Sequence, residues 1–181
     1  MILAVTGRRA QAAQTGFVAA IAVVDCLRLL LPIPTFQCKW PNDVMADGVK
    51  LAGMLLESAD ENWLVLGLGI DVAHAPPLDR IERPAIALAQ LGFVGTAKDV
   101  LEEFVGQMDI WLKVWRQDGF APIRAAWLER AIGLGGPILV RLETETVTGT
   151  FLDLNGDGAL VMEDEAGQTR VILAGDVFIG G

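Results

Sequence analysis

The hydrophobic pattern predicts three helices. Between residues 11 and 31, alanine, valine and leucine occur on most sides of a helical projection, which indicates a helix buried on nearly every face. Residues 96–119 carry charged and apolar positions at helical spacing, and Thr96 is placed to cap the first turn. A shorter pattern over residues 121–133 predicts a third helix that ends at Gly133. We interpret the tryptophans in these later helices as packing residues.

The strands predicted in the first part of the chain include a hairpin. Residues 1–6 read as a short apolar strand, and residues 62–72 are apolar almost throughout, which is typical of a central strand. Asp47-Gly48 is the residue pair favoured for a type I′ turn, and it leads into a strand over residues 49–57. We therefore predict that the two strands on either side of this turn pair in antiparallel orientation.

The pattern changes after Gly136. Short alternating segments are separated by turn sequences such as NGDG and EAGQ, which predicts a small antiparallel barrel or sandwich. We therefore divide the chain into one domain over residues 1–133 and a second over residues 134–181.

Composition excludes some classes of protein. The chain has 181 residues, 52% of them hydrophobic, and a net charge of −9. This acidity makes nucleic acid a poor candidate partner, and no segment is predicted to span a membrane, since Asp25 and Arg28 interrupt the most apolar stretch. Two separated cysteines indicate a reducing, cytoplasmic location and, with the single His74, do not form a soft-metal site. We interpret His74 as a solvent-facing loop residue.

Lys50 is the first candidate site residue. Strict alternation along residues 49–57 places Lys50 on one face with Ala52 and Met54, and Gly53 on the other. Lys50 could simply lie along the surface with its charge in water. A glycine within a strand, however, often marks the close approach of a ligand or of another backbone.

Lys39, Asn42 and Asp43 form a second candidate group. They follow or end a predicted strand over residues 35–40, and a turn there can direct a cation, an amide and a carboxylate into one cleft. That combination suits a phosphorylated ligand with Mg²⁺. The alternative is a polar turn whose Asn and Asp side chains bond their own backbone.

The segment GLGIDV, residues 67–72, resembles a dinucleotide-binding motif only superficially. It lacks the third glycine, and no helix is predicted directly after it, so we reject that interpretation. Gly67 and Gly69 nevertheless lie on one face of the strand, where they leave a smooth strip for a flat ring.

The order of these segments resembles one family. KWPNDV, then KLAGMLLES, then VLGLGIDV, a charged helix and a small β module are similar to the biotin protein ligases, the biotin–[acetyl-CoA-carboxylase] ligase family. Lipoate ligases share the fold but not the KWPND pentapeptide. The resemblance implies an α+β fold, in which a mixed β-sheet packs with helices as in class II aminoacyl-tRNA synthetases, followed by a small SH3-like β-barrel.

The resemblance also implies a reaction. Members of this family join biotin to ATP, releasing pyrophosphate, and then transfer the biotinyl group to a lysine of the biotin carboxyl carrier domain of a biotin-dependent carboxylase. ATP, biotin and Mg²⁺ are therefore the expected ligands, and that carrier domain is the expected partner.

Roles follow for the matching residues. By resemblance, Lys50 contacts the biotin carboxylate and the phosphate, while Asp43 serves the metal and the carrier lysine. The residues expected to bind substrate or nucleotide are Lys39, Trp40, Asn42, Gly53, Gly67, Gly69 and Asp71. Asp71 departs from the family, which has Asn there, and its negative charge is unfavourable near phosphates unless it helps to hold Mg²⁺.

A larger departure concerns the arginine loop of the family. Its Gly-Arg-Gly-Arg-x-Gly-Arg segment is expected before the strand that MILAVT resembles, and it is absent from this sequence. We therefore expect impaired ligase activity in this chain, an N-terminally incomplete catalytic domain and a possible homodimer through the first strand. The alternative is a non-catalytic relative that binds a nucleotide, a carrier domain or a partner subunit.

Overall fold

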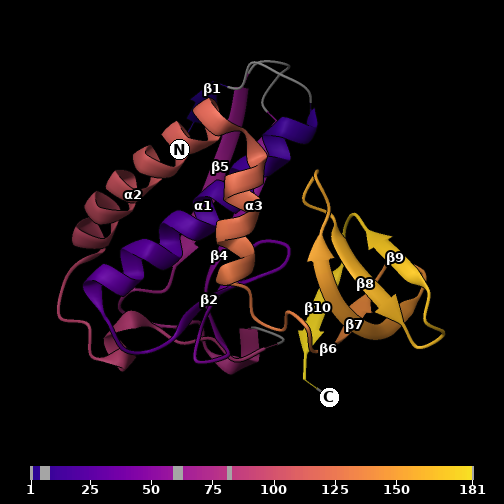
Figure 1. Ribbon diagram of the computed structural model, residues 1–181. Coiled ribbons are helices and arrows are strands. Elements are labelled where there is room, and N and C mark those ends of the chain that lie inside the picture. The colour runs from indigo at the N-terminus through magenta and orange to yellow at the C-terminus, as the bar shows by residue number, and fades with distance from the viewer. Residues whose placement is uncertain (1, 5–8, 59–62, 81–82, 181) are drawn as a thin grey trace.

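The protein has an α+β fold built on two five-stranded sheets (Figure 1). The computed structural model describes residues 2–4, 9–58, 63–80 and 83–180. The helices are α1 Arg9–Leu30, α2 Ala97–Asp118 and α3 Phe120–Glu129, with 3₁₀ turns at Leu78–Arg80 and Leu88–Leu91. The first sheet contains β1 Ile2–Ala4, β2 Phe36–Lys39, β3 Asp43–Ala46, β4 Val49–Ser58 and β5 Trp63–Ile70. The second contains β6 Pro137–Arg141, β7 Thr146–Leu154, β8 Leu160–Asp164, β9 Thr169–Ile172 and β10 Asp176–Ile179.

The first sheet has the strand order β1-β5-β4-β3-β2. Every pairing between its described strands is antiparallel, so the predicted mixed sheet is wrong for this part of the chain. The reason is that β2, β3, β4 and β5 follow one another through short connections, which permit antiparallel pairing only. Among the described residues, parallel contacts occur as two isolated bridges, Cys38 with Ala131 and Lys50 with Ala85.

The hairpin prediction is confirmed. Asp47 and Gly48 connect β3 to β4, and their φ angles are 46° and 80°. Positive φ at both central positions is what a type I′ turn requires. The carboxylate of Asp47 also accepts a hydrogen bond from the backbone N–H of Thr35, which fixes the turn beside the start of β2.

Helix α1 forms the centre of the core. Its residues from Val18 to Val24 are at most 2% exposed, because the first sheet lies on one side of the helix and α2 and α3 on the other. The segment Ala13–Leu30 is long and apolar enough to cross a membrane, but two thirds of it is buried within the protein. Its hydrophobicity is therefore explained by core packing.

Helix α3 is shorter than the sequence predicted. It ends at Glu129 rather than Gly133 because the following residues join the edge of β2. The backbone N–H of Cys38 donates to the carbonyl of Arg130, and Ile132 N–H donates to the carbonyl of Cys38. These bonds between distant parts of the chain replace the last turn of the predicted helix.

The second sheet has the strand order β10-β6-β7-β8-β9, and its described pairings are all antiparallel, as predicted. It lies beside α3 (Figure 1). Two contacts tie it to the first part of the chain. The indole N–H of Trp40 donates to the Gly158 carbonyl at 3.0 Å, and Arg124 bonds the Leu154 carbonyl at 2.6 Å. The loop before β3 and helix α3 thus fix the position of the second sheet.

Candidate functional site

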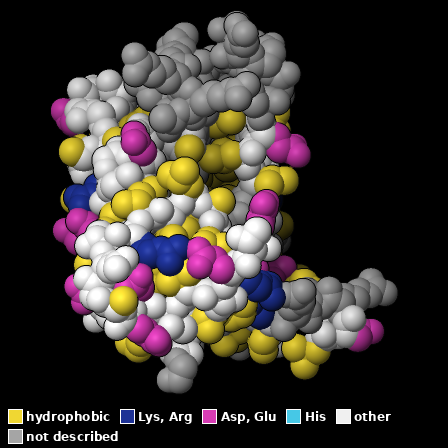
Figure 2. Space-filling model, turned by 90° about the vertical axis from the view of Figure 1, so that its right-hand side faces the viewer, with side chains coloured by type: hydrophobic (Ala, Val, Ile, Leu, Met, Phe, Trp, Pro, Cys, Tyr) yellow, Lys and Arg dark blue, Asp and Glu magenta, His cyan; other side chains and the backbone are white. Residues whose placement is uncertain are grey.

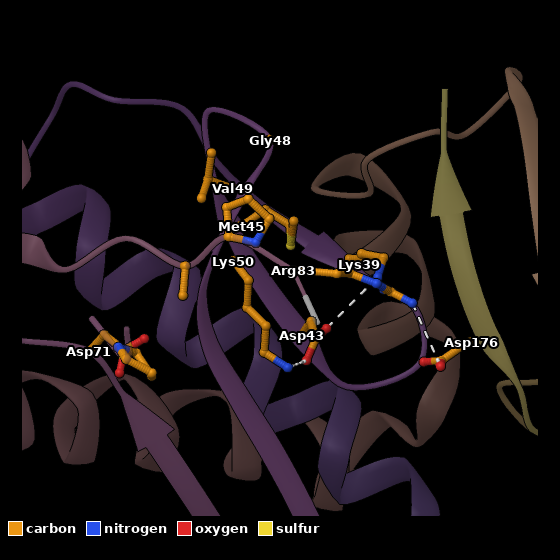
Figure 3. A pocket seen from close by; sticks show the side chains of 12 residues that line it. Lys39, Asp43, Met45, Gly48, Val49, Lys50, Asp71, Arg83 and Asp176 are labelled. Atoms are coloured by element: carbon orange, nitrogen blue, oxygen red, sulfur yellow. Dashed lines mark ion pairs between the residues drawn. The ribbon is translucent and has the colours of Figure 1, made fainter. Parts of the chain in front are cut away.

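Charged side chains from both parts of the molecule surround one cavity of about 480 Å³ (Figure 3). Its charged lining residues are Lys39, Asp43, Lys50, Asp71, Arg83 and Asp176. They come from β2, β3, β4, the end of β5, the loop that follows it and β10. The cavity therefore joins the two sheets, and it brings together four of the residues predicted from sequence with two that were not.

Asp43 lies between two lysines. Its carboxylate is 2.5 Å from Lys50 Nζ through Oδ1 and 3.8 Å from Lys39 Nζ through Oδ2. Lys50 is half-exposed toward the cavity, whereas Lys39 is only 6% exposed. The Lys50 ammonium group is thus paired with Asp43 at the wall of the cavity, while 44% of the side chain surface stays in contact with water. An acid flanked by two cations leaves a net positive charge available to an anionic ligand.

The pKa of the Lys39 ammonium is lowered. Burial is the main cause, because it penalises the charged form, and the nearby Arg83 and Lys50 charges act in the same direction. Asp43 and Asp176 oppose the shift. An anionic ligand in the cavity would favour the charged lysine in the same way as these carboxylates.

A β-bulge in β4 aims Lys50 at the cavity. Successive residues of β3 oppose Lys50 and Ala52, so that Leu51 is an extra residue in β4. Leu51 and Ala52 are both buried, whereas a side chain at Gly53 would meet the Lys50 ammonium. Our expectation that Lys50 shares a face with Ala52 and Met54 is therefore wrong. The extra residue reverses the alternation and places Lys50 on the face of Gly53.

Gly53 lies directly beneath the ion pair. A Cβ atom built at this position would be 3.3 Å from Asp43 Oδ1 and 3.3 Å from Lys50 Nζ, which is tighter than ordinary contacts. The lack of a side chain therefore lets the Lys50–Asp43 pair lie flat against β4.

We expect Gly53→Ala to weaken the binding of a small anion in this cavity by about tenfold, because a shift of a few tenths of an ångström misplaces both charged groups. The free energy of unfolding should change by less than about 1 kcal/mol, since the backbone at Gly53 is ordinary strand. Calorimetric titration with inorganic phosphate measures the first effect, and urea unfolding measures the second. Gly106→Ala in α2, where an added methyl meets nothing within 4 Å, is the matched control. Equal affinities for phosphate in both variants would contradict the prediction.

Gly67 and Gly69 lie opposite β4 on the exposed face of β5, away from the helices. Gly69 pairs with Gly53 and Gly67 pairs with Leu55. A Cβ at Gly69 would find only one backbone oxygen, at 4.0 Å, and one at Gly67 would contact only Leu55. The smooth strip expected from the sequence is thus present in the sheet, continuous with the Gly53 position.

Trp40 and Asn42 do not line the cavity that contains Lys50. Trp40 is buried, with its indole bonded to Gly158, and the Asn42 amide donates to the Met54 carbonyl at 2.7 Å. Both residues line a second hollow of about 490 Å³ between α1, β4 and the second sheet. Figure 2 shows that apolar side chains gather on this side of the molecule. Asn42 bonds a neighbouring strand rather than its own turn, so it secures the position of Asp43.

Asp71 lines the cavity on the other side of Lys50 (Figure 3). Burial raises the pKa of the Asp71 carboxyl, and the Lys50 charge partly offsets this shift. Its backbone N–H donates to the Leu51 carbonyl, and its carbonyl accepts from Leu88. Two backbone hydrogen bonds therefore hold this position, and the side chain places a carboxylate at the wall of the cavity.

Sequence reasoning missed Arg83 and Asp176. Arg83 lies in the loop after β5 and Asp176 begins β10, and their nearest N–O distance is 3.6 Å. No local motif marks either residue, because they meet only when the second sheet packs against that loop. Their residue types alone could not have identified them as site residues, because other arginines and aspartates in the sequence carry the same charges.

The cysteines and the histidine lie outside the site. Cys26 and Cys38 are buried free thiols, and burial raises the pKa of Cys26 to about 12 and that of Cys38 still further. His74 is exposed in its loop. In the part of the chain that the structure describes, no group of three or more His, Cys, Asp or Glu residues could by itself hold a metal ion.

Comparison with known families gives two matches. Residues 1–129 match the biotin/lipoate A/B protein ligase family, and residues 133–180 match the biotin protein ligase C-terminal domain. A biotin–[acetyl-CoA-carboxylase] ligase from Paracoccus denitrificans is 39% identical over 191 aligned positions, covering 100% of this chain and 79% of the relative. One from Mycobacterium tuberculosis is 32% identical, covering 88% of this chain and 59% of the relative.

Solved structures show the same fold. A biotin protein ligase from Aquifex aeolicus in complex with biotin and ATP superposes with a TM-score of 0.81 at 24% identity. The match covers 93% of this chain and 72% of that protein. A biotin protein ligase-like protein of unknown function from Silicibacter gives a TM-score of 0.79 at 23% identity.

Proposed function

This chain belongs to the biotin/lipoate A/B protein ligase family, and on that premise we propose that it activates biotin with ATP and transfers it to a lysine of a biotin carboxyl carrier domain. The observation that carries the proposal is the Lys50–Asp43–Lys39 cluster at the wall of one cavity. Activation brings a carboxylate against a phosphate, and two lysines in a partly buried site offset that repulsion.

In the first step, a biotin carboxylate oxygen attacks the α-phosphorus of ATP, and the bond to pyrophosphate breaks with its electron pair on the leaving group. Lys50 is half-exposed in the cavity, so its ammonium group is the one that reaches both anions. Buried Lys39 adds a fixed positive charge behind Asp43. These groups stabilise charge without reorganising during the reaction.

In the second step, the amine of the carrier lysine attacks the acyl carbon and AMP leaves with the bonding electrons. We assign Asp43 the role of orienting this amine and accepting its proton, because a lysine amine is protonated at neutral pH and must lose that proton. Asp43 is suited to this role because Asn42 and the Gly53 backbone fix its position in the sheet.

Mg²⁺ fits this site in one mode only. Because the described residues offer no cluster of three ligands, the ion would be held by substrate phosphates together with one carboxylate, a mode that Mg²⁺ often adopts. Asp43 and Asp71 lie on either side of Lys50 and each presents such a carboxylate (Figure 3). When bound, the ion neutralises phosphate charge. This mode also accounts for an aspartate at position 71.

The glycine strip of β4 and β5 is the proposed place for the biotin rings. Gly67 and Gly69 leave backbone groups open to a flat ligand, and Gly53, which pairs with Gly69, lies beneath the Lys50–Asp43 pair at the end of the strip. Trp40 contributes indirectly in this proposal, by bonding the second sheet at Gly158 and so keeping the nucleotide cavity closed on that side.

We place the domain boundary between residues 133 and 134. The change of sheet and the two family matches support a catalytic domain over 1–133 and a smaller domain over 134–181, for which we propose an SH3-like closed form. On the premise of family membership, we also propose a cytoplasmic location, where carboxylases and ATP are available. We propose a homodimer on the same premise.

The direct test incubates the purified chain with ATP, Mg²⁺, biotin and an apo carrier domain, and reads the carrier by intact mass. We expect a gain equal to one biotinyl group, dependent on ATP. A carrier whose acceptor lysine is replaced by arginine is the control. No gain at any protein concentration would contradict the ligase proposal and favour a non-catalytic family member.

A further inference from the structure

Arg83 is held at the junction of the two sheets by an aromatic ring and a backbone carbonyl as well as by the carboxylate of Asp176. Its guanidinium carbon is 3.9 Å from the centre of the Phe178 ring, and an N–H donates to the Val177 carbonyl at 3.5 Å. Its side chain is nevertheless 31% exposed and lines the cavity that contains Lys39 and Lys50. Stacking and the backbone bond therefore fix the arginine while one face of its charge stays available.

Asp176 is likewise held by its own sheet. It pairs in register with Arg141 of β6, and its carboxylate accepts a hydrogen bond from that arginine at 2.8 Å. This bond lowers the pKa of Asp176, so the carboxyl group is charged at neutral pH. Its carboxylate also reaches to 3.6 Å from Arg83 and lines the cavity (Figure 3).

The charged residues that line this cavity are balanced. Lys39, Lys50 and Arg83 face Asp43, Asp71 and Asp176. Asp43 pairs with the two lysines in the free protein, and Asp176 is the carboxylate that pairs with Arg83. A polyanion that enters the cavity therefore approaches Arg83 against the negative charge of Asp176.

We propose that Arg83 and Lys39 form a subsite for the terminal phosphates of a nucleoside triphosphate, or for the pyrophosphate it releases, and that Asp176 partly occupies this subsite in the free protein. This proposal rests on the proposed function, in which Lys50 binds the α-phosphate. Asp176 then lowers the affinity for the polyphosphate and favours release of pyrophosphate after the first step. An arginine suits this role because its planar group binds phosphate through paired N–H donors.

The competing explanation is that Asp176 is needed to hold Arg83 in place. The two explanations predict opposite signs. Removal of the Asp176 charge strengthens phosphate binding if the carboxylate competes, and weakens it if the carboxylate positions the arginine. The replacement Asp176→Asn leaves a carbonyl oxygen that accepts the Arg141 hydrogen bond, so the strand pairing is retained.

The test measures binding of inorganic pyrophosphate to the whole chain by calorimetry, without metal. We expect Asp176→Asn to bind about five- to tenfold more tightly than the unmodified chain, and Arg83→Gln about tenfold more weakly. In the double variant, Asp176→Asn should no longer increase the affinity for pyrophosphate, because Arg83, the residue with which Asp176 interacts, has been replaced. Glu145→Gln is the matched control. Glu145 pairs with Arg170 at 2.6 Å in the second domain and does not line the cavity, so its replacement also removes one paired carboxylate charge but leaves the cavity unchanged.

Unchanged or weaker binding by Asp176→Asn would overturn the proposal, and so would an unchanged affinity in Arg83→Gln. Absence of pyrophosphate binding in every variant would overturn it as well. Because no biotin or carrier is present, this result is separate from the transfer assay. If carrier biotinylation fails while the predicted order of affinities holds, the subsite stands and the ligase proposal falls.

Discussion

Replacing Lys50 by methionine is expected to slow formation of the acyl-adenylate by about 10²–10³-fold, the usual effect of removing one donor that stabilises charge in a transition state. The Lys50 ammonium lies 2.5 Å from Asp43 within the cavity, on the strand face that the bulge in β4 creates. Methionine keeps an unbranched apolar side chain only one heavy atom shorter and removes the charge. The chemical step then loses an electrostatic contribution, while the packing of the stem is retained.

The measurement is biotin-dependent release of pyrophosphate, followed in single turnover so that product release does not limit the rate. Lys113→Met is the matched control, since Lys113 pairs with Asp109 at 2.6 Å on an exposed face of α2. That variant should keep its rate within a factor of two. A Lys50→Met rate within tenfold of the unmodified protein would remove Lys50 from the mechanism.

Replacing Trp127 by alanine is expected to lower the free energy of unfolding by about 3–5 kcal/mol. Trp127 of α3 is 1% exposed and lies edge-on to Phe17 of α1, with ring centres 5.6 Å apart. Phe17 in turn contacts Phe120 at 5.5 Å. Loss of the indole opens a cavity among rings that hold α1 and α3 together, and close-packed neighbours fill such a space only in part.

Urea unfolding monitored by far-UV circular dichroism checks this value. Leu101→Ala is the control, because Leu101 is also helical but 57% exposed, and its replacement should cost less than about 1 kcal/mol. A loss below about 1 kcal/mol for Trp127→Ala would show that the aromatic cluster does not stabilise the fold. Such a result would also weaken the role assigned to α3 in positioning the second sheet.

Local signals in the sequence determined most of the elements. Thr96 caps α2 by accepting a hydrogen bond from Asp99 N–H, as its position predicted, and Asp47-Gly48 forms the turn that its residue types favour. The buried helix α1 and the exposed face of β5 follow from the spacing of apolar residues and glycines. These features depend on residues close together in the chain, so a sequence pattern is sufficient to predict them.

Tertiary structure decided how the site is assembled. The bulge that turns Lys50 toward Gly53 arises in the pairing of β3 with β4, which no single-strand pattern contains. Trp40, which was expected to bind substrate or nucleotide, donates its indole N–H to the Gly158 carbonyl, and Arg83 meets Asp176 across the two sheets. Such contacts join residues far apart in sequence. They form because the packing of the two sheets determines which charged residues line the same cavity. The spacing of residues along the sequence does not contain that information.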